Sequence, residues 1–179
     1  KKILRKSDLN LFEKINNYFC EHLVRKKIRK QFGGNLQAFV SGGGALEKNI
    51  GEFLNAVGLP TLQGYGLTEA SPVVSCNLPD LVKVDSVGPP FRTNKVKIAE
   101  DGEILIKGEN VMLGYWNLKE ETQKVIKNGW LHTGDIGELD KNNYLKITDR
   151  KKDIIVNLGG DNISPSKIEN ILCLNENIK

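Results

Sequence analysis

The chain has 179 residues, a mass of 20.0 kDa and a formal net charge of +4. Its 39% of apolar residues is a globular composition that excludes a mainly disordered protein, and no stretch approaches the roughly 20 consecutive apolar residues of a membrane helix. Most of the cations are Lys rather than Arg, which gives little support for nucleic-acid binding. The three cysteines lack zinc-like spacing and predict reduced thiols in a cytoplasmic protein. Because the chain begins with Lys1 and its only Met is Met112, we expect a piece of a longer protein.

The first predicted element is an amphipathic helix. Apolar residues recur at three- and four-residue spacings over residues 11–23, Ser7 or Asp8 can cap the start, and Gly33-Gly34 ends it. The last turns, residues 25–30, are strongly basic. They fit either a solvated face at a helix C-terminus or a patch that contacts a membrane surface.

A strand, a helix and a second strand follow, with glycines at the strand ends. Residues 36–41 and 59–63 read as strands, and residues 47–56 read as the helix between them. A triple glycine, residues 42–44, follows the first strand, and the second runs into a flexible glycine turn, residues 64–66. In an open α/β sheet, ligands bind at the carboxyl ends of the strands. We therefore expect both glycine segments to line one pocket.

The pattern of apolar and polar residues changes near Pro89-Pro90. Residues 96–99 and 103–107 alternate around Asp101-Gly102, a hairpin signal, and residues 144–148 form another strand after a polar turn. A short helix is predicted over residues 120–127. This part reads as a small antiparallel β unit.

The stretch after Arg150 reads as the start of a truncated domain. It contains a strand at residues 154–157, a Gly159-Gly160 turn and a helix that opens at Ser164-Pro165. So few residues cannot bury a core of their own.

Residues 64–69 are the first candidate site. Tyr65 offers a flat face to a base, the Thr68 hydroxyl can hydrogen-bond a phosphate oxygen, and Glu69 can hold Mg²⁺ together with substrate phosphates. The alternative is an ordinary turn with a capping Thr. Neither a P-loop nor a complete dinucleotide fingerprint is present in the sequence.

Two further candidates lie in the second half. Asp135, after Thr-Gly at the end of an apolar stretch, can accept hydrogen bonds from ribose hydroxyls, or it can simply form a turn. The charge run at residues 149–153 is either a hinge or a solvated surface. A hairpin between Asp135 and Arg150 should bring these two residues into the same cleft as Tyr65.

Together and in this order, these elements resemble the acyl-adenylate-forming superfamily of acyl-CoA synthetases, firefly luciferase and peptide-synthetase adenylation domains. The resemblance covers essentially the whole chain and points most to bacterial long-chain fatty acyl-CoA synthetases. Five motifs carry it: SGGG (41–44), QGYGLTE (63–69), GEILIKGENVMLGY (102–115), GWLHTGDIG (129–137) and DRKKDIIVNLGGDNISPSKIE (149–169).

The resemblance implies roles for the matching residues. Thr68, Glu69 and Lys152 would be catalytic, through the α-phosphate, the Mg²⁺ ion and a domain hinge respectively. The nucleotide and coenzyme A would be held by Gly42, Gly43, Gly44, Gly64, Tyr65, Gly66, Thr68, Asp135, Arg150, Gly159 and Gly160. In this set Tyr65 packs on adenine, Asp135 and Arg150 reach the ribose, and the last two glycines face the pantetheine path.

The implied fold is mixed α/β. Residues 1–85 would form a partial α/β subdomain, residues 86–150 a small antiparallel β-barrel subdomain, and residues 151–179 the start of a C-terminal lid domain.

The implied reaction is that of an AMP-forming long-chain fatty acid–CoA ligase, with ATP, Mg²⁺ and coenzyme A and no nucleic-acid partner. The family's upstream phosphate loop and downstream adenylation lysine are missing from the chain, so we expect the isolated chain to be inactive. The alternatives are another adenylating ligase with a different acid or a carrier-protein acceptor, a non-catalytic nucleotide-binding module, and a peripheral module at the inner membrane face.

Overall fold

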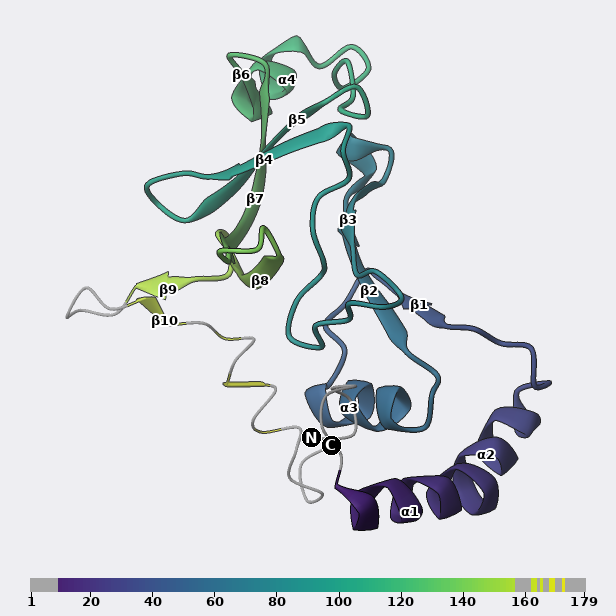
Figure 1. Cartoon of the computed structure of the whole chain (residues 1–179). Coiled ribbons are helices and arrows are strands. Elements are labelled where there is room, and N and C mark those ends of the chain that lie inside the picture. Colours follow the sequence, from purple (N-terminus) through teal and green to yellow (C-terminus); the bar gives the residue numbers. More distant parts are fainter. Residues whose placement is uncertain (1–9, 157–161, 164, 166–167, 170–171, 173–179) are drawn as a thin grey trace. The chain divides into compact units, whose positions relative to one another are not determined.

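The computed structural model describes residues 10–156, 162–163, 165, 168–169 and 172. It is a mixed α/β structure, as predicted, and it divides into two compact units (Figure 1). Unit 1 comprises residues 1–66 and 75–89, and unit 2 comprises residues 67–74 and 90–179. The boundary after Gly66 divides the candidate motif at residues 64–69 between the two units.

Unit 1 begins with one continuous helical stretch. It consists of α1 (Leu11–Cys20), the π-helical segment η1 (Glu21–Arg25) and α2 (Lys26–Gln31). The predicted caps, Ser7 and Asp8, lie outside the described residues. The observed cap is Asn10, whose side chain accepts a 2.8 Å hydrogen bond from the Glu13 amide, while the Glu13 carboxylate accepts one from the Asn10 amide. This reciprocal capping box satisfies two amides that a helix start otherwise leaves unpaired.

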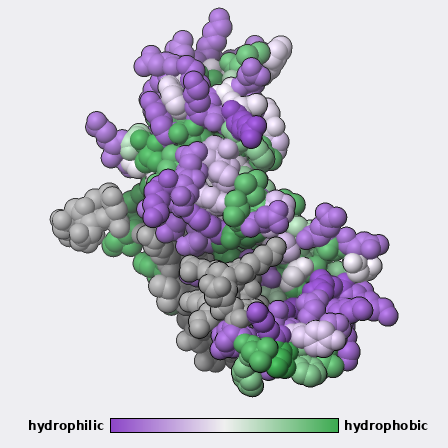
Figure 2. All heavy atoms as spheres, in the orientation of Figure 1, coloured by the Kyte–Doolittle hydropathy of each residue, from purple (hydrophilic) through white to green (hydrophobic). Residues whose placement is uncertain are grey.

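The apolar face of α1 is open to solvent in unit 1. Leu11 and Phe12 are 76% and 72% exposed, and Figure 2 shows hydrophobic residues over this helix. The basic end is partly engaged within the unit, because Arg29 pairs with Glu21 and donates a 2.9 Å hydrogen bond to the Val57 carbonyl. In the described part of the chain, no helix has the length and apolar character needed to cross a membrane.

The sheet of unit 1 has the order β1-β2-β3. Its strands and their connecting helix are β1 (Phe39–Ser41), α3 (Lys48–Ala56), β2 (Thr61–Gly66) and β3 (Val73–Cys76), the last of which begins in unit 2. β1 and β2 are parallel, with Ser41 opposite Gln63. The predicted turn at residues 64–66 is wrong, because these residues continue β2. A Cβ on Gly64 would lie 3.2 Å from the Ser75 carbonyl oxygen, so the glycine allows the next strand to approach closely.

Two buried amides tie the segment after β3 to β2. Gln63 is 7% exposed and donates a 2.5 Å hydrogen bond to the Val84 carbonyl. Asn77 is 2% exposed, donates to the Ser86 carbonyl at 2.6 Å and accepts from the Lys83 amide at 2.9 Å. These bonds satisfy polar groups that would otherwise be costly to bury, and they fix the loop that closes unit 1.

Unit 2 is built on an antiparallel sheet, as predicted. Its elements are η2 (Thr68–Ala70), β4 (Asn94–Ile98), β5 (Glu103–Gly108), α4 (Lys119–Val125), β6 (Ile126–Lys127), β7 (Trp130–Leu139) and β8 (Leu145–Arg150). The hairpin at Asp101-Gly102 joins β4 to β5. We describe a sheet rather than a barrel because, among the described strands, no pairing joins β4 to β6 or β8.

Strand β7 is the central element of unit 2, although the sequence pattern did not reveal it as a strand. One edge pairs with β5, and the other pairs with β6 near Trp130 and with β8 from Asp135 onward. The core beneath it contains Ile104, Ile106, Leu131 and Leu145, each no more than 1% exposed.

After β8 the described chain contains one short antiparallel pair, β9 (Ile155–Val156) and β10 (Asn162–Ile163). The predicted turn at Gly159-Gly160 and the predicted helix start at Ser164 lie outside the described residues.

Two glycines of unit 1 test how closely the backbone packs there. Gly43 and Gly88 have similar φ values, +78° and +81°, but a Cβ on Gly43 meets nothing within 4 Å, whereas one on Gly88 would lie 2.0 Å from a backbone atom of Cys76. Gly43→Ala should cost about 1–2 kcal/mol from backbone strain alone. Gly88→Ala should cost about 1–3 kcal/mol more from overpacking. Urea denaturation of both variants measures the difference, and equal losses would contradict the packing argument.

Candidate functional site

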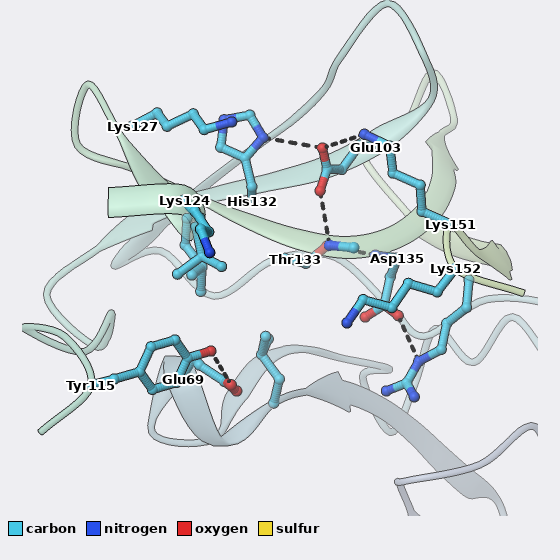
Figure 3. Close-up of a pocket in the computed structure, with 15 residues that line it drawn as sticks. Glu69, Glu103, Tyr115, Lys124, Lys127, His132, Thr133, Asp135, Lys151 and Lys152 are labelled. Carbon is cyan, nitrogen blue, oxygen red and sulfur yellow. Dashed lines mark hydrogen bonds and ion pairs between the residues drawn. The ribbon is translucent and has the colours of Figure 1, made fainter. Parts of the chain in front are cut away.

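Unit 2 contains a cavity of about 600 Å³ (Figure 3). Its walls come from the segment after β2, from β5, the loop before α4, α4 itself, β6, β7, the end of β8 and the turn after it. The lining residues used below are Glu69, Glu103, Tyr115, Asp135, Arg150 and Lys152. All of these residues belong to unit 2, so the cavity is complete within one compact unit.

One wall presents Glu69, whose backbone and carboxylate each accept a hydrogen bond. The Glu69 carbonyl accepts a 2.8 Å hydrogen bond from the Met112 amide, and its Oε1 accepts one of 2.8 Å from the Tyr115 hydroxyl. The same hydrogen bond raises the pKa of Tyr115, because ionised Tyr115 would face a carboxylate. Thr68 is exposed and is not among the residues that line this cavity.

The opposite wall carries Asp135 and Arg150. The two residues are paired across β7 and β8, and Arg150 Nε donates a 3.2 Å hydrogen bond to Asp135 Oδ1. The Asp135 side chain is 12% exposed, whereas that of Arg150 is 73% exposed. Asp135 therefore lies inside a strand, and its interpretation as a turn residue is wrong. The structure brings this pair to the same cavity as Glu69, but Tyr65, which was expected there, is not among the residues that line it.

A third carboxylate that lines the cavity, that of Glu103, is more deeply buried. Glu103 is 6% exposed, and its Oε1 accepts a 2.9 Å hydrogen bond from the Gly134 amide. Its Oε2 lies 3.1 Å from both His132 Nδ1 and Lys151 Nζ. Burial raises the pKa of Glu103, but the hydrogen bonds from these three donors outweigh it, so the pKa of Glu103 is lowered.

Lys151 also joins the hairpin turn to this cluster. Its Nζ donates a 2.7 Å hydrogen bond to Asp101 Oδ2, which lowers the pKa of Asp101. The hydrogen bonds to Asp101 and Glu103 raise the pKa of Lys151. The charge run at residues 149–153 is therefore more than a solvated surface, since two of its members contact acidic residues of unit 2.

Lys152 lines the cavity from the turn that follows β8. The turn is held by two backbone hydrogen bonds, from the Lys151 amide to the Gly134 carbonyl at 2.8 Å and from the Asp153 amide to the Arg150 carbonyl at 3.0 Å. Lys152 thus lies directly after a residue whose amide is bonded to β7, and its role as a hinge stays a prediction.

The candidates in unit 1 lie at the carboxyl ends of β1 and β2. Because Ser41 is opposite Gln63, Gly42 lies beside Gly64, and a Cβ on Gly42 would be 3.7 Å from the Gly64 carbonyl oxygen. Gly43 and Gly44 face open space. Tyr65 and Gly66 end β2. The predicted glycine segments are therefore neighbours on parallel strands, while Gly159 and Gly160 lie outside the described residues.

Sequence reasoning assigned no role to Glu103, Tyr115, His132 or Lys151. Glu103 carried a usable signal, since it is a charged residue at the start of a strand whose next residues are Ile104, Leu105 and Ile106. Charged residues are seldom fully buried unless paired. The partners of Glu103 lie 29 to 48 positions away, and no local pattern identifies them.

The donor set fits Mg²⁺ in one specific way. In the described residues, no group of three or more His, Cys, Asp or Glu side chains could hold a metal ion. Mg²⁺ nevertheless binds commonly through one or two carboxylates together with substrate phosphates. Glu69, which lines the cavity, is suited to that mode rather than to a cage made wholly of protein.

A model of the AMP-binding enzyme family matches residues 10–116, which is more than half of the chain. The chain belongs to the AMP-binding enzyme family. Among the relatives is the long-chain-fatty-acid–CoA ligase FadD15 of Mycobacterium bovis, 41% identical over 152 residues that cover 85% of this chain and 25% of the relative. Another is the 2-succinylbenzoate–CoA ligase of Oceanobacillus iheyensis, 36% identical over 168 residues that cover 89% of this chain and 35% of the relative.

A solved structure has a similar fold. The O-succinylbenzoate coenzyme A synthetase of Bacillus subtilis, in complex with ATP and magnesium ion, matches with a TM-score of 0.69 and 31% identity. The match covers 82% of this chain and 34% of that protein. This chain therefore spans about a quarter to a third of the length of these AMP-binding enzymes.

The buried carboxylate predicts a defined pH dependence of stability. Since folding lowers the pKa of Glu103, the carboxylate stabilises the fold above about pH 4.5, its ordinary pKa, and this contribution is lost as the pH falls through the lowered value. The difference in unfolding free energy between wild type and Glu103→Gln should thus be largest near neutral pH and shrink in acid. Lys151→Met should reduce that pH-dependent difference, because it removes one donor. A difference that stays constant from pH 7 to pH 3 would contradict this.

Proposed function

We propose that the full-length protein, meaning the product of the complete reading frame, is an AMP-forming acid–thiol ligase that activates a long-chain fatty acid and transfers it to coenzyme A. The observation that carries the proposal is the cavity of unit 2, on which Glu69, Asp135, Arg150 and Lys152 meet. A site for a nucleotide needs groups that accept hydrogen bonds from the ribose hydroxyls and groups that neutralise the phosphate charge. This cavity presents candidates for both. Family membership supports the same reaction class.

In the first half-reaction, a carboxylate oxygen of the fatty acid attacks the α-phosphorus of ATP. The bond between that phosphorus and the bridging oxygen to the β-phosphate breaks, which gives acyl-AMP and pyrophosphate. Glu69 would hold Mg²⁺, which offsets the repulsion between the carboxylate and the phosphates. The exposed Thr68 hydroxyl would donate to the α-phosphate. The Asp135 carboxylate, which accepts a hydrogen bond from Arg150, would bind the ribose hydroxyls while Arg150 contacts the same sugar.

In the second half-reaction, the sulfur of coenzyme A attacks the acyl carbonyl carbon. The carbon–oxygen bond to AMP breaks, AMP leaves, and the thiol proton passes to solvent. We propose that Lys152 is the hinge about which residues 151–179, the start of a lid domain, move between the two steps. The proposed roles of Gly42, Gly43, Gly44, Gly64, Tyr65 and Gly66 at the adenine, and of Gly159 and Gly160 beside the pantetheine, stay predictions.

Two relatives point to different acid substrates. The fatty-acid assignment is supported by the relative named as a long-chain-fatty-acid–CoA ligase. The second candidate is a different carboxylic acid, and it is favoured by the relative named as a 2-succinylbenzoate–CoA ligase. A fatty-acid substrate would suit a cytoplasmic enzyme that contacts the inner membrane face, and the exposed apolar residues of α1 are compatible with such contact.

Pyrophosphate exchange tests the function directly. The full-length protein with Mg-ATP should exchange labelled pyrophosphate into ATP with palmitate, and should form palmitoyl-CoA when coenzyme A is added. Exchange with 2-succinylbenzoate but not palmitate would assign the second candidate. The 179-residue chain assayed in parallel should be inactive, because it lacks the family's phosphate loop and adenylation lysine. If the full-length protein exchanges pyrophosphate with neither acid, that result would favour a non-catalytic nucleotide-binding module.

Asp135→Ala tests the ribose contact. Loss of a charged acceptor that faces hydroxyls should cost about 2 kcal/mol, or about 30-fold in kcat/KM for ATP. The matched control is Glu138→Ala on the same strand, which removes an exposed carboxylate paired with Lys146 and should leave ATP kinetics unchanged. Equal effects of the two substitutions would argue against the ribose role.

A further inference from the structure

Glu103 is a buried charged residue at the start of β5, where strand pairing does not require a charged side chain. The three residues that follow it in β5 are 0%, 6% and 0% exposed, and they form the core of unit 2. Removing a carboxylate from water is costly, and an apolar side chain of similar volume often serves stability at least as well. The position of Glu103 therefore calls for an explanation beyond strand pairing.

The first connection of Glu103 leads to Asp135. The pairing of β5 with β7 shifts register between Glu103 and Leu105, and at this irregularity Gly134 has a φ of +73°. The amide of Gly134 donates to Glu103 Oε1 at 2.9 Å. Thr133 continues the connection, since its hydroxyl donates to the Ile104 carbonyl at 2.8 Å and accepts from the Asp135 amide at 3.1 Å. These bonds fix the backbone immediately before Asp135, and so they set the direction in which its carboxylate points.

The second connection leads to the turn after β8. Lys151 Nζ lies 3.1 Å from Glu103 Oε2, and the Lys151 amide donates to the Gly134 carbonyl at 2.8 Å. Lys151 stands between Arg150, which pairs with Asp135, and Lys152, which lines the cavity. One carboxylate thus contacts both the strand that carries Asp135 and the segment that carries its partner. Figure 3 shows Glu103 between His132 and Lys151, with Thr133 and Asp135 beside them.

We propose that Glu103 is a positioning residue for the nucleotide site, which holds Asp135 through Gly134 and holds the Arg150–Lys152 turn through Lys151. This inference rests on the proposed function, since the ligand is the ribose of the adenine nucleotide. His132 completes the cluster as the third donor to the carboxylate. Glu103 does not itself contact the ligand in this proposal. It acts by keeping the acceptor and its cationic partner in one arrangement.

The test is AMP binding to the full-length protein by calorimetry, combined with hydrogen–deuterium exchange of peptides that cover residues 132–136 and 149–153. Glu103→Ala should weaken AMP binding at least tenfold and speed exchange in both peptides. Glu103→Gln should weaken binding less, about threefold, because its amide oxygen still accepts from Gly134 while the ion pair with Lys151 is lost. In this variant exchange should rise mainly in the 149–153 peptide. Glu138→Gln, the matched control on β7, should bind AMP within twofold of wild type.

Two results would overturn the inference. One is faster exchange in Glu103→Ala with AMP affinity within twofold of wild type, which would make Glu103 merely structural. The other is an equal loss of affinity in Glu138→Gln. If Glu103→Ala does not fold, the test is carried by Glu103→Gln. Hydrogen–deuterium exchange and AMP affinity equal to those of the wild type in that variant would overturn the inference. The wild-type affinity for AMP tests the proposed function, whereas the ratio of variant to wild type tests the role of Glu103.

Discussion

The pairing of β7 on both of its edges is the constraint on which unit 2 depends. One edge receives β5, which supplies the buried core and Glu103, and the other receives β8, which ends at Arg150. Antiparallel register places Asp135 directly opposite Arg150, so the acid and its cationic partner meet without any contribution from a flexible loop. A site carried by paired strands is positioned more firmly than one carried by loops.

Irregular pairing is as important as regular pairing in this unit. Register shifts occur where β7 passes Glu103 and again between Ile136 and Gly137. Such bulges commonly redirect a side chain beside a functional site. Here the first shift coincides with Gly134, and the backbone bonds around it leave Asp135 mostly buried yet on the cavity wall. Regular pairing without these shifts would have kept the side chains of β7 alternating strictly between the two faces of the sheet. It would thereby have changed the face on which the Asp135 carboxylate lies.

Three carboxylates, those of Glu69, Glu103 and Asp135, line the cavity. On its walls, Glu69 accepts a hydrogen bond from Tyr115, and Asp135 accepts one from Arg150. Glu103 lies deeper and has three donors, which keep it ionised despite burial. A buried charge is tolerated only when its hydrogen-bonding capacity is used, and these three donors meet that need for Glu103.

The sequence by itself determined the family, the mixed fold class, the hairpin at Asp101-Gly102 and the meeting of Asp135 with Arg150, because motifs and hairpin spacing are local. It predicted a turn at residues 64–66, where the structure has a strand, because only the neighbouring strand shows that Gly64 serves close packing. It did not reveal β7 as a strand, and it gave Glu103, His132 and Lys151 no role. These residues lie up to 48 positions apart, and their contacts exist only once β5, β7 and the turn after β8 have come together. Tertiary structure decided them because a buried carboxylate takes whichever donors the folded chain brings within reach, and no local pattern records which these will be.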